Sequence, residues 1–168
     1  FDTGEVFCAG WQGSGEKGDG GTNNRYYTKR VGRTNNNGGG FDYNQQIQTY
    51  QGSKSQRGQG LMIDIQAIKI GTSNEGDYAN NSSSVMGALD INGQLWTWGY
   101  NGHSGLGRNF RYNNNWYNSY VPSKIPQQVF DNRKIRDFWL GGGNYQQGHA
   151  LDEDGNLWAW GYNGYGAL

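Results

Sequence analysis

One segment of the chain occurs twice in nearly identical form. Residues 88–102 read ALDINGQLWTWGYNG and residues 150–164 read ALDEDGNLWAWGYNG, so equivalent positions lie 62 residues apart. A repeat of this length constrains the fold strongly, because each copy must form the same small unit and bury its apolar face against the next. A weaker third copy, DTGEVFCAGW, occupies residues 2–11. Its Gly4 precedes Gly93 by 89 positions rather than 62, which predicts an insertion of 27 residues.

Each complete copy is typical of a tight hairpin followed by a strand that is buried on both faces. Asn92-Gly93 and Asp154-Gly155 are dipeptides that favour a two-residue type I′ turn, in which both central residues need a positive φ. Leu-Trp-X-Trp-Gly follows, and the alternation of a strand sends Leu and X to one face and the two tryptophans to the other. Both faces therefore need a packed sheet, as in a propeller or a solenoid. We expect the following residues on strands and mostly buried between sheets: Trp96, Trp98, Trp158 and Trp160.

Several segments resemble the regulator-of-chromosome-condensation repeat, which builds a seven-bladed β-propeller. The family pattern is a Gly-Gly turn, Ala-Leu, an Asp-Gly hairpin, Leu-Trp-X-Trp-Gly, and then Asn and Gly-X-Leu-Gly. The matching segments are 140–143, 150–151, 154–155, 157–161, 163 and 166–168, with 101 and 105–107 in the middle copy and the linking segments 64–71, 121–126 and 134–138. The resemblance implies the fold but little about function, because propellers carry many unrelated binding tasks.

We therefore predict an all-β protein, a single partial β-propeller over residues 1–168 built of hairpin or four-stranded blades. The repeats are expected at about 1–15 with 61–100, at 101–162, and at the start of the next copy, 163–168. These make between two and three blades, so we expect the missing blades from the rest of a longer polypeptide. Residues 16–60 form a Gly-, Asn- and Tyr-rich insertion, predicted to be mostly irregular with strands only at 28–31 or 43–50.

Composition narrows the possible partners. The formal net charge is zero, from 14 basic and 14 acidic residues, which argues against nucleic acid as a partner. The chain is 33% hydrophobic but 15% aromatic, so we expect a core made mainly of stacked Trp and Tyr. It contains no run of 18 apolar residues, and we therefore expect no membrane span.

No catalytic residues, metal ligands or cofactors are predicted, and the chain is not expected to be an enzyme. Its two histidines and scattered carboxylates do not form a recognisable acid–base set. Cys8 aligns with Thr97 and Ala159, which predicts a small buried residue on an inter-blade strand. The acidic segment at 152–156 faintly resembles the start of a calcium loop, but it lacks the closing Glu and is better explained as the hairpin turn.

The candidate binding residues are aromatic and amide side chains in the repeated loops. Repetition at a spacing of 62 should place Tyr100-Asn101 and Tyr162-Asn163 at the same end of successive blades. A ligand crossing that end would meet similar groups on each blade, with three further aromatic residues nearby in sequence: Trp116, Tyr117 and Tyr165. The alternative is that each Asn serves the scaffold by bonding to the backbone of its own turn, a reading we favour for the two asparagines over the tyrosines.

Two classes of function remain. The first is a non-catalytic binding or structural module of an extracellular assembly, such as a phage virion surface or tail-fibre protein or a bacterial surface adhesin. Its location would be extracellular or on the virion surface, and its partners other protein subunits or, alternatively, a glycan. The second is a soluble regulatory propeller that binds a protein partner, of the nucleotide-exchange or enzyme-inhibitor type. Neutral charge argues against the nucleotide-exchange type, which would want a basic face.

Overall fold

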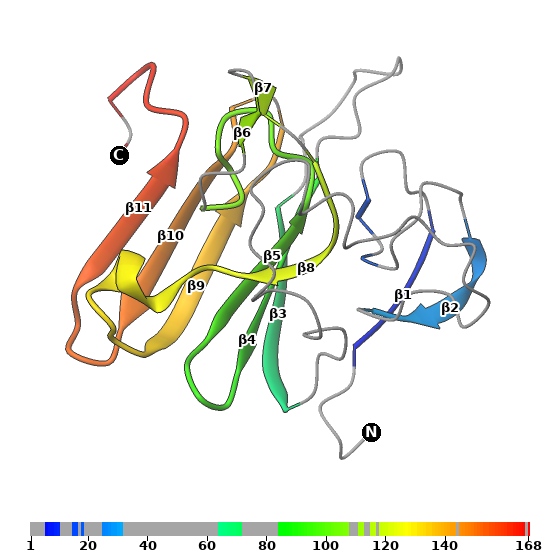
Figure 1. Ribbon diagram of the computed structural model, residues 1–168, viewed down its shortest axis with the longest axis horizontal. Coiled ribbons are helices and arrows are strands. Elements are labelled where there is room, and N and C mark those ends of the chain that lie inside the picture. The colour runs from blue at the N-terminus through cyan, green and yellow to red at the C-terminus, as the bar shows by residue number, and fades with distance from the viewer. Residues whose placement is uncertain are drawn as a thin grey trace.

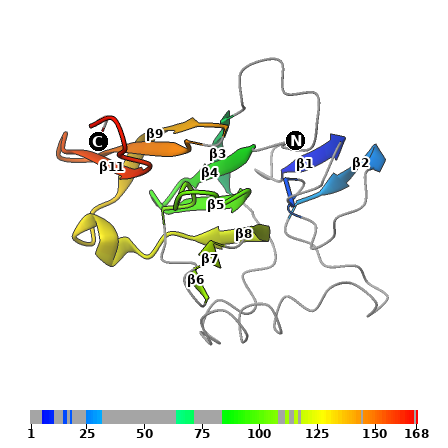
Figure 2. The same cartoon turned by 90° about the horizontal axis from the view of Figure 1, so that it is seen from above.

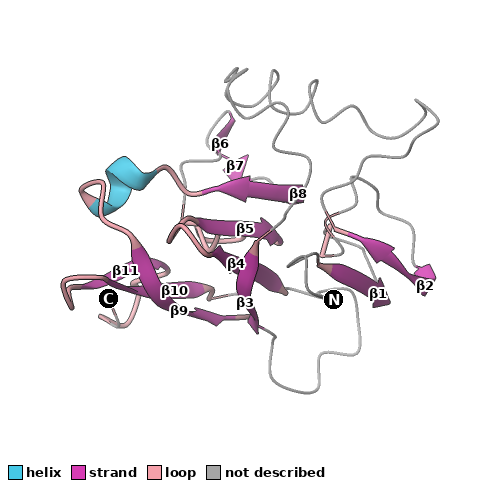
Figure 3. Cartoon of the chain, turned by 90° about the horizontal axis from the view of Figure 1, so that it is seen from below, coloured by secondary structure: helices cyan, strands magenta, loops and turns pink. Residues whose placement is uncertain are grey.

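The structure is a computed structural model, and it describes residues 6–10, 15–16, 18, 25–31, 64–71, 84–107, 111–112, 115–116, 118–143, 145–166 and 168. Strands dominate these residues (Figure 1). The strands are β1 (Phe7–Gly10), β2 (Arg25–Arg30), β3 (Ile65–Gly71), β4 (Val85–Asp90), β5 (Leu95–Gly99), β6 (Arg111–Tyr112), β7 (Asn115–Trp116), β8 (Ser119–Lys124), β9 (Ile135–Gly141), β10 (Gln147–Asp152) and β11 (Leu157–Gly161). A 3₁₀ helix, η2 (Gln127–Phe130), connects β8 to β9 (Figure 3).

The strands form three blade-like sheets that lie side by side (Figure 2). The first blade, in chain order, is the pair β1-β2, the second has the order β3-β4-β5-β8, and the third has the order β9-β10-β11; β6 and β7 make a separate short ribbon. Every pairing is antiparallel. The predicted all-β fold class, a partial propeller with up to four strands in a blade, is confirmed.

The pair β1-β2 is the outer half of a blade. Its register matches that of β5-β8, including a bulge at the same place, where a step of two positions along β1 or β5 corresponds to a step of four along the partner strand. The next bond is also equivalent, because Val31 donates to the Val6 carbonyl (2.8 Å) as Ile125 donates to the Leu95 carbonyl (2.9 Å). β1, the described strand of the weak first copy, is therefore the structural equivalent of β5.

These equivalences show where the 27 extra residues lie. The extra length is the sum of three changes: five residues fewer between the two outer strands, 24 more before the innermost strand β3, and eight more between β3 and β4. The spacings, first copy against second, are 25 against 30 (Val6–Val31 and Leu95–Ile125), 34 against 10 (Val31–Ile65 and Ile125–Ile135), and 25 against 17 (Ile65–Asp90 and Ile135–Asp152). β2 includes residues 28–30 of the predicted strand 28–31, whereas 43–50 falls outside the described residues.

The core lies between the sheets, on both faces of β5. One cluster joins the second blade to the first and contains Val6, Val31, Met86, Ala88, Trp96 and Trp98. The other joins the second blade to the third and contains Leu89, Leu95, Ile125, Phe130, Ile135, Phe138 and Ala150. Every residue of β5 is buried, as predicted for a strand with two apolar faces.

β11 has nearly the same sequence as β5 but is less buried. Trp158 and Trp160 lie on the strand as expected, yet both are only half-buried, and Leu157 is 68% exposed where its equivalent Leu95 is 0%. The reason is the surroundings: Leu95 packs against Ile135 and Phe138 of the third blade, whereas within the described part of the chain no further sheet follows β11 to cover Leu157. Cys8 in β1 is likewise half-buried rather than buried, although it packs against the first core cluster.

The prediction of type I′ turns in the two hairpins is wrong. Gly93 and Gly155 have positive φ values (78° and 88°), but Asn92 and Asp154 do not. Gly93 donates to the Asp90 carbonyl and Asp90 donates to the Gln94 carbonyl, which defines a three-residue loop: a type I turn followed by a glycine bulge. The physical cause is the Asp90 carboxylate, whose Oδ1 accepts the backbone N–H groups of residues 92 and 94 (2.9 and 3.0 Å) and so favours this turn.

An ion pair links the innermost strands of the second and third blades. The Lys69 ammonium group on β3 pairs with the Asp137 carboxylate on β9 and lies 4.7 Å from the centre of the Trp139 ring. The hydrogen bond from Lys69 is the main reason that the pKa of Asp137 is lowered. Because both carboxylate and ammonium are partly exposed, this pair contributes only modestly to stability.

Candidate binding surface at the loop end

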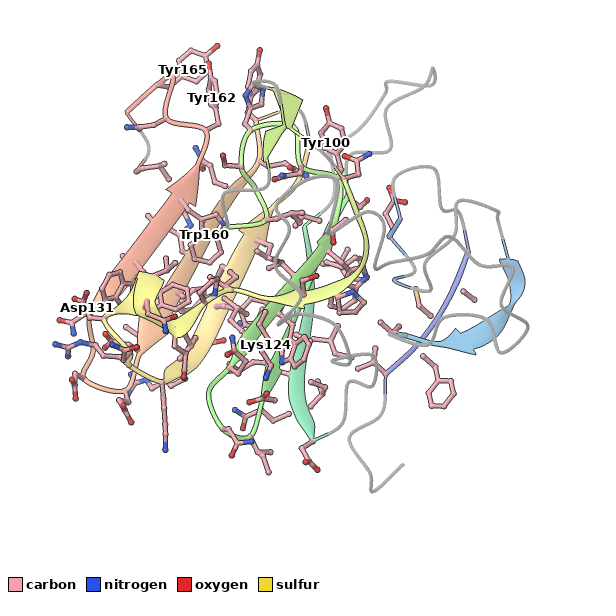
Figure 4. All side chains as sticks on the ribbon, in the orientation of Figure 1. Tyr100, Lys124, Asp131, Trp160, Tyr162 and Tyr165 are labelled. Atoms are coloured by element: carbon pink, nitrogen blue, oxygen red, sulfur yellow. The ribbon has the colours of Figure 1, made fainter. Side chains whose placement is uncertain are left out.

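The blades have two ends, which differ in the connections that lie there. The turns between β4 and β5 and between β10 and β11 lie at one end, and the loops that follow β5 and β11 lie at the other, which we call the loop end (Figure 1). Tyr100, Tyr162 and Tyr165 are all at the loop end, at the top of Figure 4. The repeat therefore places equivalent tyrosines at the same end of two neighbouring blades, as its spacing predicts.

Four rings from both blades form an aromatic cluster at this end: His103, Tyr145, Tyr162 and Tyr165. Tyr162 is at its centre, with ring centroids 4.5 Å from Tyr145, 5.0 Å from His103 and 5.8 Å from Tyr165. The His103 ring also stacks on Tyr145, with centroids 5.9 Å apart and planes 25° from parallel. Offset and edge contacts at these distances are favourable, so the cluster holds its rings in a defined arrangement.

The cluster is open to solvent on its outer side. Tyr165 is 81% exposed and Tyr145 is 55% exposed, whereas Tyr162 and His103 are half-buried beneath them. The pKa of the Tyr162 hydroxyl is raised above its usual value of 10.0, first by burial and then by the neighbouring hydroxyls of Tyr165 and Tyr145. Tyr162 is therefore a neutral hydrogen-bonding group at physiological pH.

The backbone beneath the cluster is held in place. Tyr162 donates its N–H to the Gln146 carbonyl (2.8 Å), and its own carbonyl accepts the side-chain amide of Gln147 (2.9 Å). Its ring folds over Gly164 so closely that a Cβ there would lie 1.9 Å from the Tyr162 oxygen, and Tyr100 folds over Gly102 in the same way. Among the described residues, however, Tyr100 makes no ring contact with the cluster.

A tryptophan of each following blade fixes the loop of the blade before it. The Trp160 indole N–H on β11 donates to the carbonyl of Gly105 (2.9 Å), and the Trp98 indole N–H on β5 donates to the carbonyl of Glu16 (2.8 Å). Glu16 precedes Gly105 by 89 positions, the offset of the first repeat, so the two bonds are equivalent. The predicted insertion was expected to begin at residue 16, but this contact places residue 16 within the repeat.

The two asparagines support the loop rather than lining it. Asn101 is fully buried, and its side-chain oxygen accepts the N–H of Leu106 (3.2 Å). Asn163 is exposed but makes the equivalent bond, accepting the N–H of Leu168 (3.1 Å). These hydrogen bonds are the ones expected if each Asn stabilises the backbone of its own turn. Because Asn101 is buried, its side chain is not accessible to a partner.

The structure describes the other predicted binding residues, Trp116 and Tyr117, only in part or not at all. Trp116 lies on β7 but its side chain is outside the described residues, as is Tyr117 altogether. His103 and Tyr145 belong to the cluster and were missed by sequence reasoning. A signal for His103 was present, because it precedes Tyr165 by 62 positions and so repeats a ring at the same loop position.

The described residues offer little for other chemistry. No group of three or more His, Cys, Asp or Glu in them has a geometry that would hold a metal ion. The Asp152 carboxylate, in the segment that faintly resembles a calcium loop, is occupied by the N–H groups of residues 154 and 156 and by the Trp158 indole. Nor do these parts of the chain contain a helix of the length and apolar character that crossing a membrane requires.

No protein-family model and no curated protein matches the chain. Among solved structures it is similar to a chain in the crystal structure of Kap60 bound to yeast RCC1 (Prp20), with a TM-score of 0.55 and 18% identity over 95% of this chain and 28% of that one. Human WBSCR16 also matches, with a TM-score of 0.40 and 19% identity over 96% of this chain and 44% of that one. The chain thus spans less than half the length of either. The first likeness, together with the order of the strands, identifies the fold as part of an RCC1-like β-propeller.

Proposed function

We propose that the chain is a non-catalytic binding module that contacts other protein subunits of an extracellular assembly through its loop end. The observation that carries the proposal is the aromatic cluster, which combines two exposed tyrosines with two half-buried rings on a hydrogen-bonded backbone. Tyrosines held in this way suit an interface, because they offer a large contact area and a hydroxyl at a low cost in conformational entropy.

The proposed extracellular location, on a phage virion or a bacterial surface, is supported by the amino-acid composition. The chain is neutral overall, rich in Gly and Tyr, and poor in the basic residues that nucleic-acid contact needs. Its cluster consists of tyrosines and one histidine, which suits contact with protein or, as the alternative ligand, with the flat faces of a sugar.

The second candidate is a regulatory propeller that binds a soluble protein partner. It is favoured by the solved structure to which the chain is similar, in which RCC1 is bound to another protein, Kap60. Both candidates require a protein interface, and they differ in where the partner is found.

Radical footprinting of tyrosines tests the proposal in the native setting. The oxidation rates of Tyr145 and Tyr165 are compared between the isolated chain and the virion or cell-surface particle that contains it. We expect both rates to fall in the particle, whereas Ile91, which is 63% exposed in the β4–β5 turn at the opposite end, stays equally reactive.

Unchanged reactivity of Tyr145 and Tyr165 in the particle contradicts an interface at the loop end. Protection in a soluble complex, with no chain present in particles, favours the regulatory candidate instead. As a matched pair of variants, Tyr165→Ala should weaken assembly while Ile91→Ala leaves it unchanged, and circular dichroism establishes that both variants are folded.

A further inference from the structure

Three tyrosine rings of the aromatic cluster lie close enough to react with one another. The ring centroids of Tyr145 and Tyr162 are 4.5 Å apart, with planes inclined by 38°. Tyr165 lies farther from both, at 6.1 Å from Tyr145 and 5.8 Å from Tyr162, and meets them edge-on at 78° and 68°. Tyr145 and Tyr162 are therefore the pair of phenols in closest contact.

The backbone of the third blade builds this contact. β10 and β11 are paired up to Gln147 and Gly161, and just beyond that pair the Tyr162 N–H donates to the Gln146 carbonyl (2.8 Å). Tyr145 and Tyr162 therefore extend from adjoining ends of one hairpin. The His103 ring of the second blade packs against both, with centroids 5.9 Å from Tyr145 and 5.0 Å from Tyr162, which limits how far the two rings can separate.

Two phenols held in contact can be joined by oxidation. A phenol that loses one electron and its hydroxyl proton becomes a phenoxyl radical, whose unpaired electron is shared with the ring carbons beside the C–O bond. Two such radicals couple through these carbons to give dityrosine. Rings already in contact couple readily, because the reaction needs no encounter between two molecules. Tyr145 is 55% exposed, so an oxidant can reach the pair from solvent.

We propose that Tyr145 and Tyr162 form a site of oxidative cross-linking, at which a haem peroxidase with hydrogen peroxide joins the two rings as dityrosine. The peroxide takes one electron and one proton from each phenol and is reduced to two water molecules. One carbon–carbon bond forms between the rings, and the hydrogens on the two joined carbons return to the oxygens, which restores both hydroxyl groups. The new bond would tie the β9–β10 loop to the loop after β11 and fix the arrangement of the loop end.

The test oxidises the chain with a haem peroxidase and hydrogen peroxide at low protein concentration, and the monomer is then isolated. Cleavage at the acidic residues 152–154 separates Tyr145 from Tyr162 and Tyr165. Mass spectrometry then measures the yield of the cross-linked pair of peptides, which has lost two hydrogen atoms. We expect this product in the monomer, together with the blue fluorescence of dityrosine.

Three phenylalanine variants locate the bond, since each keeps its ring and loses only the hydroxyl. Tyr162→Phe should lower the yield by about tenfold or more, because the partner in contact with Tyr145 can no longer form a phenoxyl radical. Tyr165→Phe should leave the yield unchanged, which distinguishes the two tyrosines of the same peptide. Tyr100→Phe is the matched control from the equivalent loop of the second blade, and it should also leave the yield unchanged.

An oxidised monomer without the cross-linked peptides overturns the proposal. A yield that is kept in Tyr162→Phe but lost in Tyr165→Phe also overturns it, because the bond then involves Tyr165. Dityrosine found only in dimers would show that coupling occurs between molecules and would overturn it as well. Because the isolated chain is oxidised with no binding partner present, the result does not depend on the proposed interface.

Discussion

The Trp158 indole N–H donates to the Asp152 carboxylate at 2.9 Å, and Trp96 makes the same bond to Asp90 at 3.1 Å in the preceding blade. Each carboxylate also accepts two backbone N–H groups of its own hairpin turn. In each of these two blades a buried carboxylate therefore joins three parts of the repeat: the end of one strand, the turn, and the first tryptophan of the next strand.

Replacing the two tryptophans of β11 by phenylalanine, which removes the indole N–H, should lower the free energy of unfolding by different amounts. Trp158→Phe should lower the free energy of unfolding by about 1–3 kcal/mol, because a buried charged acceptor loses a donor. Trp160→Phe removes a bond to the neutral Gly105 carbonyl and should cost less, about 0.5–1.5 kcal/mol for the hydrogen bond. Urea unfolding measures both variants, and an equal loss in the two would contradict this role for Asp152.

Stability should fall in acid in part through Asp152. Burial raises the pKa of this carboxyl group, but hydrogen bonds from Asn156, Trp158 and the turn outweigh that effect and lower the pKa to about 2 from its usual 3.8. A lowered folded-state pKa stabilises the fold above the unfolded-state value, and that stabilisation is lost as the pH falls from about 4 toward 2.

The comparison that isolates this effect is Asp152→Asn. The variant should be less stable than the original chain at pH 7, and the difference should shrink between pH 4 and pH 2 as the carboxylate of the original chain becomes protonated. Urea unfolding at several pH values gives the difference. A gap that stays constant over this range would show that the charge of Asp152 is not what stabilises the turn.

Gly107 should tolerate no side chain. Its φ is +68°, and an added Cβ would lie 2.8 Å from Ile125 and 2.9 Å from the Trp160 ring. Gly107→Ala should therefore destabilise by about 2–4 kcal/mol, from backbone strain and overpacking together. Gly166→Ala is the matched control, since its φ is +69° with nothing within 4 Å, and it should cost only about 1–2 kcal/mol. Thermal unfolding that ranks the two variants the other way would contradict the packing of Trp160 on this loop.

Replacing each of the two repeated asparagines by alanine should also change stability by different amounts. Asn101→Ala leaves the N–H of Leu106 buried without its acceptor and should cost about 1–3 kcal/mol of stability. Asn163→Ala exposes the equivalent N–H to water and should change stability by less than about 1 kcal/mol. Denaturant midpoints decide this, and a loss of partner binding by Asn101→Ala without loss of stability would return Asn101 to the binding surface.

Much of the fold was predictable from the chain because the repeat is local. The Leu-Trp-X-Trp-Gly strand and its hairpin follow from side-chain alternation and a constant spacing, and β5 is buried on both faces as predicted. The partial propeller was predicted from the resemblance of these segments to a known repeat family. The turn type was not predictable from Asn-Gly and Asp-Gly alone. The competing influence is the aspartate two positions before each dipeptide, whose carboxylate bonds to the turn.

The candidate surface was predicted less well. Tyr162 and Tyr165 belong to the aromatic cluster, but Tyr100 stands apart from it, and Asn101 is buried in the scaffold. Tyr145 joins the cluster from the loop between β9 and β10, which lies outside the repeated segment 150–164. Contacts between different loops depend on how the blades pack, which no local pattern encodes.

The amino-acid pattern alone thus specifies the repeating unit, since strand alternation and hairpin residues act over a few neighbouring positions. The packing of blades determines what each unit becomes. Nearly identical strands are buried in β5 and half-exposed in β11, and the 27 extra residues prove to be the sum of three changes around conserved pairings. The physical reason is that burial and register are set by neighbours distant in sequence, and identical side chains take different roles when those neighbours differ.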